Sequence, residues 1–569
     1  MKNLLAALFL LLFAEYSFCQ APAWQWVNFT GGTGSDFAYG PAVDASGNVY
    51  NTGCFEGTVD FDPGPGIDTL TSTPNPYQDI FITKSDPSGN LIWAKRIGGA
   101  LSDVGYALVL DAEGNLLLGG VYAGPVDFDP GPGTFNLTGN SGFVLKLDSA
   151  GNFLWAKKVG GNVNALGIDY SNNGEIYVSG NFYGTVDLDP GTAVLNFTSA
   201  GNDDIFITKL DSSGSFIWAK QIGAAYTDDC TSLAIDPTGT GAVFLTGNFA
   251  GTVDFDPGPG INNMTSLNND GNIFICKFSS AGDLNWSRNI GELVFESGYS
   301  IVADDSANVY TVGRFAATVD FDPGPGVFNL STSGGNYDTD AFISKLDSAG
   351  IFVWARRIGG STDDDIAWKA ALDRGNYDLY LGGLFEGTVD FDPGPGVYNL
   401  TSAGQWDFFL TRLTRNGDFV WAKSAGGPTG DELTGLCVVG GIAYVNCQFN
   451  SDTIMVDSLV GVNATSSGFD ADFFTARIYA IPSGIPEHIS SQGLTLYPNP
   501  GSDKIFLVGD QVTFNRVELY NLAGCQLSVL SAGFQTNNME LNVSQLPAGI
   551  YFVKVFCGND LVVRKFVKT

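Results

Sequence analysis

Pairs of aspartates recur six times along the chain, each followed by a proline and a glycine. The segment reads Val-Asp-Phe-Asp-Pro-Gly-Pro-Gly from Val59 and returns with small changes. The pairs are Asp60 and Asp62, Asp127 and Asp129, Asp187 and Asp189, Asp254 and Asp256, Asp320 and Asp322, and Asp390 and Asp392. On an extended chain, residues two apart point to the same side. Two carboxylates placed in this way, completed by carbonyl oxygens of a turn, are suited to bind calcium.

The same spacing has a second interpretation in turn chemistry. An aspartate caps a turn, a proline fixes φ, and a glycine accepts a positive φ. Every unit of a repeat protein needs the same turn, so repetition fits both interpretations. No copy matches the calcium loop of an EF-hand, and none carries a third acid in sequence. The pairs are therefore candidate calcium ligands or turn residues.

The inventory of the other reactive groups limits catalysis. The chain has one histidine, His488, close to its C-terminal region. Histidine-dependent nucleophilic catalysis is therefore excluded for the preceding repeats, as are zinc sites with histidine ligands. Carboxylate pairs can cleave glycosides, but an active site is usually one unique constellation and these pairs occur six times. We expect a protein that is not an enzyme, with a polysaccharide-acting enzyme as the alternative.

The charge of the chain narrows its partners and its location. The formal net charge is −33, which repels nucleic acid and anionic lipid headgroups. Residues 1–19 contain Lys2 and the apolar run Leu4 to Phe13, the pattern of a secretory signal peptide. No later segment has the pattern of a transmembrane span. We therefore expect a secreted protein with no nucleic-acid partner.

Recurrent residues define seven units that must position these groups. A tryptophan followed closely by glycine returns at Trp26, Trp93, Trp155, Trp218, Trp286, Trp354 and Trp421. A cation recurs once per unit at Lys84, Lys146, Lys209, Lys277, Lys345 and Arg412, and we expect these cations to pair with the aspartates. The tryptophans are expected to pack between units.

Each unit contains four short runs rich in β-branched and aromatic residues. In the fifth unit the runs are Tyr299 to Ala303, Val309 to Phe315, Ala341 to Leu346 and Phe352 to Arg357. Four antiparallel strands per unit are typical of a propeller blade. The last unit lacks its tryptophan strand. The N-terminal run Trp24 to Phe29 is a tryptophan strand with no other strand of a unit before it, so it can complete the last unit. The predicted fold class is all-β: a seven-bladed β-propeller over residues 20–480, closed by the N-terminal strand. An open solenoid is the alternative.

The units resemble the bacterial β-propeller repeats called SBBP. The resemblance rests on Gly47-Asn48-Val49-Tyr50 with Gly53, then Phe81 with Lys84, then Gly89 with Trp93. It extends over about residues 24–480. It implies a fold and says little about activity.

After a linker at residues 481–493, residues 494–569 begin a new pattern of short strands, which predicts a small β-sandwich. This region resembles a type A sorting domain of the type IX secretion system. The matching motif residues include Tyr497, Pro498, Asn499, Pro500, Gly549, Tyr551 and Lys554. The resemblance implies export across the outer membrane, removal of the domain by a sortase-like peptidase, and then anchoring or release.

These observations together predict a binding or adhesion protein, displayed on the cell surface or released. Its propeller would present an acidic loop face to an extracellular ligand, a polysaccharide or a surface protein. A structural matrix component is the third interpretation. The only cofactor expected is calcium.

Overall fold

The structure is a computed structural model, and the described residues fall into two compact units. They are residues 22–32, 34–72, 77–267, 271–292, 296–334, 338–360, 364–451, 454–456, 471–479, 494–497, 504–509, 514–521, 526–544, 546, 549–557 and 560–568. One unit is Pro22–Tyr479 and the other contains the residues from 494 onward. The expected signal peptide, residues 1–19, and the expected linker, residues 481–493, lie outside the described residues.

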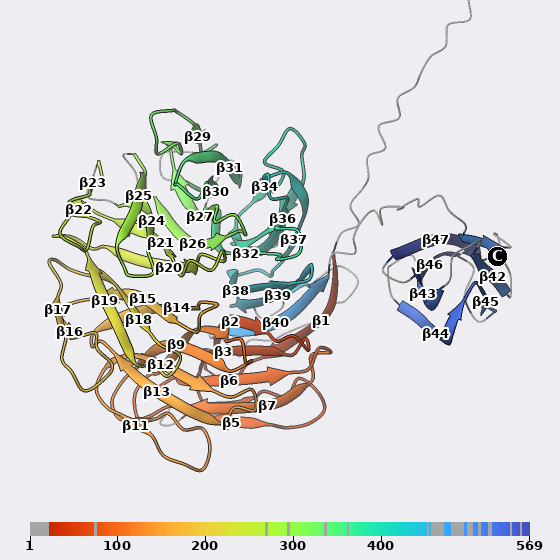
Figure 1. Ribbon diagram of the computed structural model, residues 1–569, viewed down its shortest axis with the longest axis horizontal. Coiled ribbons are helices and arrows are strands. Elements are labelled where there is room, and N and C mark those ends of the chain that lie inside the picture. The colour runs from red at the N-terminus through yellow and green to blue at the C-terminus, as the bar shows by residue number, and fades with distance from the viewer. Residues whose placement is uncertain are drawn as a thin grey trace, which may run out of the picture. The chain divides into compact units, whose positions relative to one another are not determined.

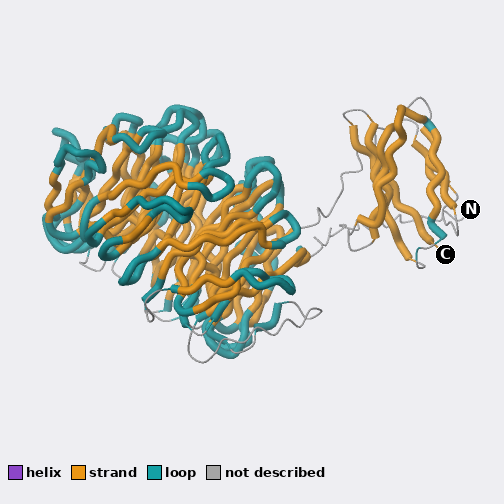
Figure 2. Tube along the Cα trace, turned by 90° about the horizontal axis from the view of Figure 1, so that it is seen from below, coloured by secondary structure: helices purple, strands orange, loops and turns teal. Residues whose placement is uncertain are grey.

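Strands and loops make up all of the described chain, as Figure 2 shows, so the all-β prediction is confirmed. The first unit contains seven antiparallel sheets in propeller-like succession, of which six have four strands and one has six because a two-stranded hairpin pairs with its fourth strand. We number them 1 to 7 along the chain. Six of them follow sequence order from the first strand to the fourth, and sheet 7 has the order β38-β39-β40-β1.

The strands of sheets 1 to 3 are β2 (Phe37–Val43), β3 (Val49–Phe55), β6 (Asp79–Ser85) and β7 (Leu91–Ile97); β8 (Val104–Leu110), β9 (Leu116–Tyr122), β12 (Ser141–Leu147) and β13 (Phe153–Val159); and β14 (Val163–Tyr170), β15 (Ile176–Phe182), β18 (Asp204–Leu210) and β19 (Phe216–Ile222). The strands of sheets 4 and 5 are β20 (Asp229–Ile235), β21 (Val243–Phe249), β24 (Asn272–Phe278) and β25 (Leu284–Ile290); and β26 (Ser297–Ala303), β27 (Val309–Ala316), β30 (Thr339–Leu346) and β31 (Phe352–Gly360). The strands of sheets 6 and 7 are β32 (Ile366–Leu372), β33 (Leu379–Phe385), β36 (Asp407–Leu413) and β37 (Phe419–Ala425); and β38 (Asp431–Val439), β39 (Ile442–Phe449), β40 (Asp472–Tyr479) and β1 (Ala23–Thr30).

The first strands of the sheets lie toward the middle of this unit, as Figure 1 shows for β14, β20, β26, β32, β38 and β2. Each first strand contacts the first strand of the next sheet, and β2 of sheet 1 also contacts β38 of sheet 7. The Thr434 hydroxyl donates a hydrogen bond to the Ala38 carbonyl oxygen at 2.5 Å. The strand β1 pairs with β40, with Thr30 opposite Phe473. The N-terminal strand is therefore part of the last sheet.

The apolar core lies between neighbouring sheets. One cluster joins Tyr310 and Ile343 of sheet 5 to Leu381 and Phe409 of sheet 6. The rings of Phe81 in sheet 1 and Phe473 in sheet 7 stack with centroids 5.2 Å apart. Burial between sheets explains why second and third strands are apolar on both faces, since each face meets another sheet.

The recurrent tryptophans connect each sheet to the next one. The Trp286 indole N–H of sheet 4 donates to the Ser348 carbonyl oxygen of sheet 5 at 3.1 Å. Its ring lies against Gly350, whose φ of 75° requires a residue without a Cβ. The same contact joins Trp26 to Gly89, Trp93 to Gly151, Trp155 to Gly214, Trp218 to Gly282 and Trp354 to Gly417. Sheets 1 to 5 thus each supply the glycine for one neighbour and the tryptophan for the other.

The Asp-Pro-Gly segments lie between second and third strands, where each forms a small two-stranded hairpin. These hairpins are β4 (Thr58–Asp60) with β5 (Thr69–Thr71), β10 (Val126–Asp127) with β11 (Asn136–Leu137), β16 (Thr185–Asp187) with β17 (Asn196–Thr198), β22 (Thr252–Asp254) with β23 (Asn263–Thr265), β28 (Thr318–Asp320) with β29 (Asn329–Ser331), and β34 (Thr388–Asp390) with β35 (Asn399–Thr401). The residues on either side of the first aspartate are buried, as Val253 and Phe255 illustrate. They anchor the hairpin in the core while its tip stays exposed.

The second unit consists of a three-stranded and a four-stranded sheet. The first has the order β41 (Leu494–Tyr497), β42 (Lys504–Gly509) and β45 (Asn538–Asn542). The second has the order β44 (Gln526–Thr536), β43 (Phe514–Asn521), β46 (Gly549–Cys557) and β47 (Asp560–Lys568). Residues of both sheets, including Leu507 and Val553, form one buried cluster. The two sheets therefore share one core.

Candidate functional site

The six aspartate pairs are engaged by the backbone of their own hairpins. Asp254 Oδ1 accepts hydrogen bonds from the Asp256 N–H at 3.1 Å and from the Asn262 N–H at 2.8 Å. Asp256 Oδ1 accepts from the Gly258 N–H at 2.8 Å. The other five copies repeat this arrangement. This is the geometry of the turn interpretation, in which side-chain oxygens satisfy backbone donors.

A metal-binding cluster would be built from histidine, cysteine and acidic side chains. Within the part of the chain that the structure describes, no group of three or more such residues is arranged to hold a metal ion. A calcium site built from one aspartate pair and turn carbonyls would contain only two such side chains, so this observation does not test it. Calcium binding by the hairpins therefore stays a prediction.

The recurrent cations pair with different acids from those expected. Lys146 Nζ lies 2.7 Å from Asp111 Oδ2, and Lys277 Nζ lies 3.0 Å from Asp236 Oδ2. Lys209, Lys345 and Arg412 likewise pair with Glu175, Asp304 and Asp378, and Lys84 donates to the Ser149 carbonyl oxygen of sheet 2. These acids lie in the turn between the first and second strands of each sheet. The cation lies near the end of the third strand, which is at that same end of the sheet, so it can reach the turn. The expected pairing with the Asp-Pro-Gly aspartates was wrong.

The acids that link successive sheets are buried. Asp36, Asp103, Asp228, Glu296, Asp365 and Asp431 are all inaccessible to solvent or nearly so. In sheet 4 the buried link acid is Asp228 rather than the neighbouring Asp229. Burial is the main cause that raises the pKa values of the five aspartates, to about 8 for Asp365 and about 7 for Asp431. These carboxyls stabilise the junctions between sheets. The Asp103 carboxylate, for example, accepts hydrogen bonds from the Gly99 N–H, which precedes sheet 2, and from the Ala123 N–H, which follows its second strand.

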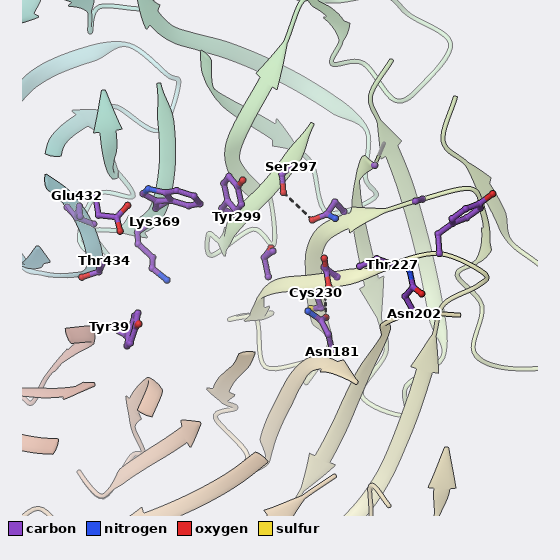
Figure 3. Close-up of a pocket in the computed structure, with 18 residues that line it drawn as sticks. Tyr39, Asn181, Asn202, Thr227, Cys230, Ser297, Tyr299, Lys369, Glu432 and Thr434 are labelled. Carbon is purple, nitrogen blue, oxygen red and sulfur yellow. Dashed lines mark hydrogen bonds between the residues drawn. The ribbon is translucent and has the colours of Figure 1, made fainter. Parts of the chain in front are cut away.

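A cavity of about 840 Å³ opens among the first strands of the sheets (Figure 3). Its residues come from six of the seven sheets, with none from sheet 2. They are Tyr39, Asn181, Asn202, Tyr226, Thr227, Asp229, Cys230, Thr231, Asn248, Ala250, Gly271, Ser297, Tyr299, Trp368, Lys369, Glu432, Leu433 and Thr434. The lining is not repeated from sheet to sheet.

A local irregularity of the first strands places side chains in this cavity. In every sheet the pairing of the first and second strands shifts by one residue at the same position. The residues skipped by the shift are Tyr39, Tyr106, Ala165, Thr231, Tyr299, Trp368 and Thr434. Five of them line the cavity. A β-bulge re-aims a side chain in this way and often lies beside a functional site.

Aromatic rings and amide groups face the cavity together. The rings of Tyr299 and Trp368 lie 4.4 Å apart at an angle of 52°. Asn248 Oδ1 accepts a hydrogen bond from the Ser297 hydroxyl at 3.1 Å, and Asn181 Oδ1 accepts from the Cys230 N–H at 2.6 Å. Figure 3 shows both bonds and shows the Lys369 side chain extending into the open space on the side of Tyr39. The surface offers flat apolar area beside groups that donate and accept hydrogen bonds.

The charged groups of the cavity have shifted pKa values. Burial raises the pKa of Asp229, helped by the charge of Asp203 and opposed by a hydrogen bond from Asn248. Burial also raises the pKa of Glu432, and a hydrogen bond from Trp368 opposes it. Burial lowers the pKa of Lys369, whose side chain keeps only partial exposure toward the cavity. Two acids and one amine thus meet in a region where water solvates them poorly.

The cavity was not predicted from the sequence, although two signals pointed to it. One position after the strand glycine varies while its neighbours repeat, and Asn181 and Asn248 occupy it in sheets 3 and 4. Its other occupants do not line the cavity, and two of them, Cys54 and Leu384, are buried. The second signal is the changing residue type at the bulge of the first strand.

The described cysteines of the first unit are free thiols: Cys54, Cys230, Cys276, Cys437 and Cys447. Cys437 lies opposite Tyr444 in the hairpin of β38 and β39, so it does not face Cys447. Burial raises the pKa of Cys230 to about 12. Although Cys230 lines the cavity, it is therefore a poor nucleophile.

The sorting-motif residues fall partly within the second unit. Tyr497 ends β41 and is half exposed, and its ring lies 5.8 Å from that of Phe506. Tyr551 in β46 is buried and stacks on Phe566 with centroids 5.2 Å apart. Gly549 begins β46, and Lys554 lies opposite Glu518 in the same sheet. Pro498, Asn499 and Pro500 lie outside the described residues.

Residues 495–569 match the family described as secretion system C-terminal sorting domain. This type IX secretion tail shows that the protein is secreted, either into the medium or onto the outer cell surface. The chain is thus a secreted, all-β repeat protein with a propeller-like first unit. In the described residues, no helix has the length and hydropathy needed to cross a membrane.

Two curated relatives share part of the repeat region. One is an uncharacterised WD repeat-containing protein of Acanthamoeba polyphaga mimivirus, 27% identical over 263 residues, which cover 40% of this chain and 18% of the relative. The other is the regulatory protein FlaEY of Caulobacter vibrioides, 24% identical over 375 residues, which cover 63% of this chain and 38% of the relative. The chain thus spans less than two fifths of the length of either relative.

Solved structures similar to the chain include Sqt1 from Chaetomium thermophilum, with a TM-score of 0.39 and 12% identity over 75% of this chain and 97% of that one. A gluconolactonase from Xanthomonas campestris has a TM-score of 0.28 and 12% identity over 61% of this chain and 83% of that one.

Proposed function

We propose that residues 22–479 form a seven-bladed β-propeller closed by β1, and that the secreted protein binds an extracellular saccharide in the cavity among its first strands. Three contacts between sheets 1 and 7 support closure: the Thr434 to Ala38 hydrogen bond, the Phe81 and Phe473 stack, and the packing of Trp26 on Gly89. Closure leaves no sheet edge at the ends of the repeat array.

The observation that carries the saccharide proposal is the mixed lining of the cavity. Aromatic rings of Tyr39, Tyr226, Tyr299 and Trp368 offer flat apolar surfaces. The amides of Asn181, Asn202 and Asn248 and the hydroxyls of Thr227 and Ser297 both donate and accept hydrogen bonds. A sugar ring has apolar C–H faces and a rim of hydroxyls, so it matches such a surface. The cavity volume of about 840 Å³ is within the range of small-ligand sites.

This contact differs from the acidic loop face that the sequence favoured. The hairpin tips repeat around the unit and their aspartates are occupied by backbone donors. The cavity brings together residues that differ from sheet to sheet, which gives it the means to select one ligand. We therefore place the ligand in the cavity and regard the charged tips as the solvated surface.

A polysaccharide-acting enzyme is the second candidate, because Asp229 and Glu432 line the same cavity and both have raised pKa values. A carboxyl with a raised pKa can act as a general acid. Hydrolysis of a bound oligosaccharide that Asp229→Asn and Glu432→Gln both abolish would establish this candidate. Tight binding with no turnover supports the binding protein.

The test is saccharide binding by the purified secreted protein, measured on a glycan array and then by calorimetry. Tyr226→Ala removes an exposed ring from the cavity, and Tyr183→Ala removes an exposed ring elsewhere on the surface. We expect Tyr226→Ala and Trp368→Ala to weaken binding about tenfold or more, and Tyr183→Ala to leave it unchanged. Equal effects of Tyr226→Ala and Tyr183→Ala, or no saccharide binding by the wild type, would reject the proposal and favour a structural matrix component.

A further inference from the structure

Lys369 stands out among the residues at its position in the repeat. It follows the bulged residue of the first strand in sheet 6. The corresponding residues of the other sheets are Gly40, Ala107, Leu166, Ser232, Ser300 and Gly435. All of these are uncharged. One copy of a repeated strand thus places an amine in the cavity, beside the bulged Trp368.

The environment of Lys369 differs from that of the recurrent cations. Each of Lys146, Lys209, Lys277, Lys345 and Arg412 forms an ion pair with an acid of its own sheet. No acidic side chain among the described residues lies within ion-pairing distance of Lys369, although Glu432 and Asp229 line the same cavity. Burial alone is the cause of its lowered pKa, so no nearby acid stabilises its charge. A desolvated ammonium without a counter-ion is energetically unfavourable, so binding an anion beside it would stabilise its charge.

We propose that Lys369 binds the carboxylate of an acidic saccharide, a hexuronate unit, whose ring lies against the aromatic pair of Tyr299 and Trp368. This inference rests on the proposed saccharide function and names the ligand class of that same cavity. The three N–H donors of the ammonium match the two carboxylate oxygens. Trp368 precedes Lys369 in β32, and its ring contacts that of Tyr299 in β26. The remaining lining amides hold the hydroxyls.

The charge of the whole protein makes this placement selective. With a net charge of −33, the surface disfavours polyanions in general. An acidic sugar is therefore held only where a positive group is available. Lys369 supplies one, and the volume of its cavity is sufficient for only a few sugar units. A ligand carboxylate near the amine also raises its pKa again, because an opposite charge favours the protonated form.

The experiment compares a tetragalacturonate with the same oligosaccharide after its carboxyl groups are reduced to alcohols. Binding of both forms is measured calorimetrically with the full secreted protein and with Lys369→Met, Lys369→Arg and Lys158→Met. Lys158 is an exposed lysine outside the cavity and serves as the matched control. We expect the wild type and Lys158→Met to prefer the acidic form at least tenfold, since a hydrogen bond to a charged group is worth about 1.5–3 kcal/mol.

We expect Lys369→Met to lose that preference and keep its affinity for the reduced form, while Lys369→Arg keeps most of the preference. Added salt should weaken the acidic form in the wild type more than in Lys369→Met. Equal affinity of the wild type for both forms overturns the role of Lys369 and leaves the saccharide proposal standing. Binding of neither form overturns both. Borohydride trapping of the reducing-end aldehyde on Lys369 would show imine formation instead, and would also overturn the ionic role.

Discussion

Asp407 lies beside Asp431 at the junction between sheet 6 and sheet 7, and both carboxyls are buried. Asp407 Oδ2 accepts from the Ala403 N–H at 2.9 Å, and Asp431 Oδ2 accepts from the Gly427 N–H at 2.6 Å. Burial is the main cause that raises the pKa of Asp431 to about 7, and the charge of Asp407 raises it further while hydrogen bonds oppose the rise. Equivalent pairs occur at four other junctions: Asp36 with Asp472, Asp103 with Asp79, Asp228 with Asp204, and Asp365 with Asp340.

These junctions predict that the folded protein is more stable at mildly acidic pH than at alkaline pH. An acid whose pKa is raised by folding binds its proton more tightly in the folded state. Its stabilising contribution is complete below the ordinary pKa of about 4, and it is lost as the pH rises through about 6 to 8. We expect the melting temperature to fall by at least a few degrees between pH 5.5 and pH 8.5.

Asp407→Asn tests the origin of this pH dependence. The junction between sheets 4 and 5 already carries Asn272 at the equivalent position, so the substitution is compatible with the fold. Removing one of the two charges should lower the pKa of Asp431 and flatten the stability profile by on the order of 1 kcal/mol. The exposed Asp283→Asn is the control. A profile that Asp407→Asn leaves unchanged would assign the pH dependence to other groups.

The Asp-Pro-Gly hairpins yield a second prediction. Because Asp254 Oδ1 accepts two backbone N–H groups, Asp254→Ala should cost about 1 kcal/mol of stability, and to the same extent in calcium and in chelator. Asp254→Asn should retain most of that stability, since its amide oxygen still accepts. Differential scanning calorimetry measures both.

Calcium binding by the hairpins would give the opposite pattern. One site occupied at 100 times its dissociation constant adds about 2.7 kcal/mol of stability. A melting temperature that rises in millimolar calcium for the wild type, with the rise reduced in Asp254→Ala, would make the pairs metal ligands.

Gly313 in β27, the second strand of sheet 5, should tolerate no side chain. A Cβ at Gly313 would overlap the Ser297 carbonyl oxygen of the paired strand and the Phe342 ring. Neither the strand backbone nor this buried ring has room to move, so Gly313→Ala should cost several kcal/mol or abolish secretion of folded protein. Gly114→Ala is the control, since a Cβ there meets nothing within 4 Å and costs only the strain of a φ of 80°, about 1 kcal/mol. Urea unfolding compares the two variants.

The ion pair between Lys146 and Asp111 should be strongly coupled. The Asp111 side chain is inaccessible, and Lys146→Met would leave its carboxylate buried without a counter-ion. Breaking one partner of such a pair costs about 3–5 kcal/mol. The double variant Lys146→Met with Asp111→Asn should recover part of that loss. A double variant less stable than either single variant would contradict the pairing.

Local patterns predicted the strands of the repeats closely. The fifth unit was expected at Tyr299 to Ala303 and Val309 to Phe315, and these residues lie in β26 and β27. The two-residue turn at Gly440 and Gly441 explains why Cys437 lies opposite Tyr444. These features depend on neighbouring residues, so alternation and turn chemistry are sufficient to predict them.

The cavity could not be predicted in the same way. Its lining combines Asn181 with Glu432, residues that lie far apart in the chain and meet only after the sheets pack. The bulges that aim Tyr299 and Trp368 are a property of strand register, which alternation does not show. The burial of the link acids also depends on the packing of sheets, since the Asp103 carboxylate accepts hydrogen bonds from the Gly99 and Ala123 N–H groups at a junction.

The pairing of β1 with β40 also has a consequence for folding kinetics. Thr30 and Phe473 belong to opposite ends of the repeat array, so sheet 7 forms only after all the intervening units have been synthesised. Bringing such distant segments together carries a loop-closure entropy, and non-local pairing slows folding. Sheets 1 to 6 consist of contiguous strands and can form in order, whereas the last sheet waits for both ends. The pairing of β1 with β40 is therefore the expected slow phase of refolding, and a chain cut within β40 should populate a partly assembled intermediate.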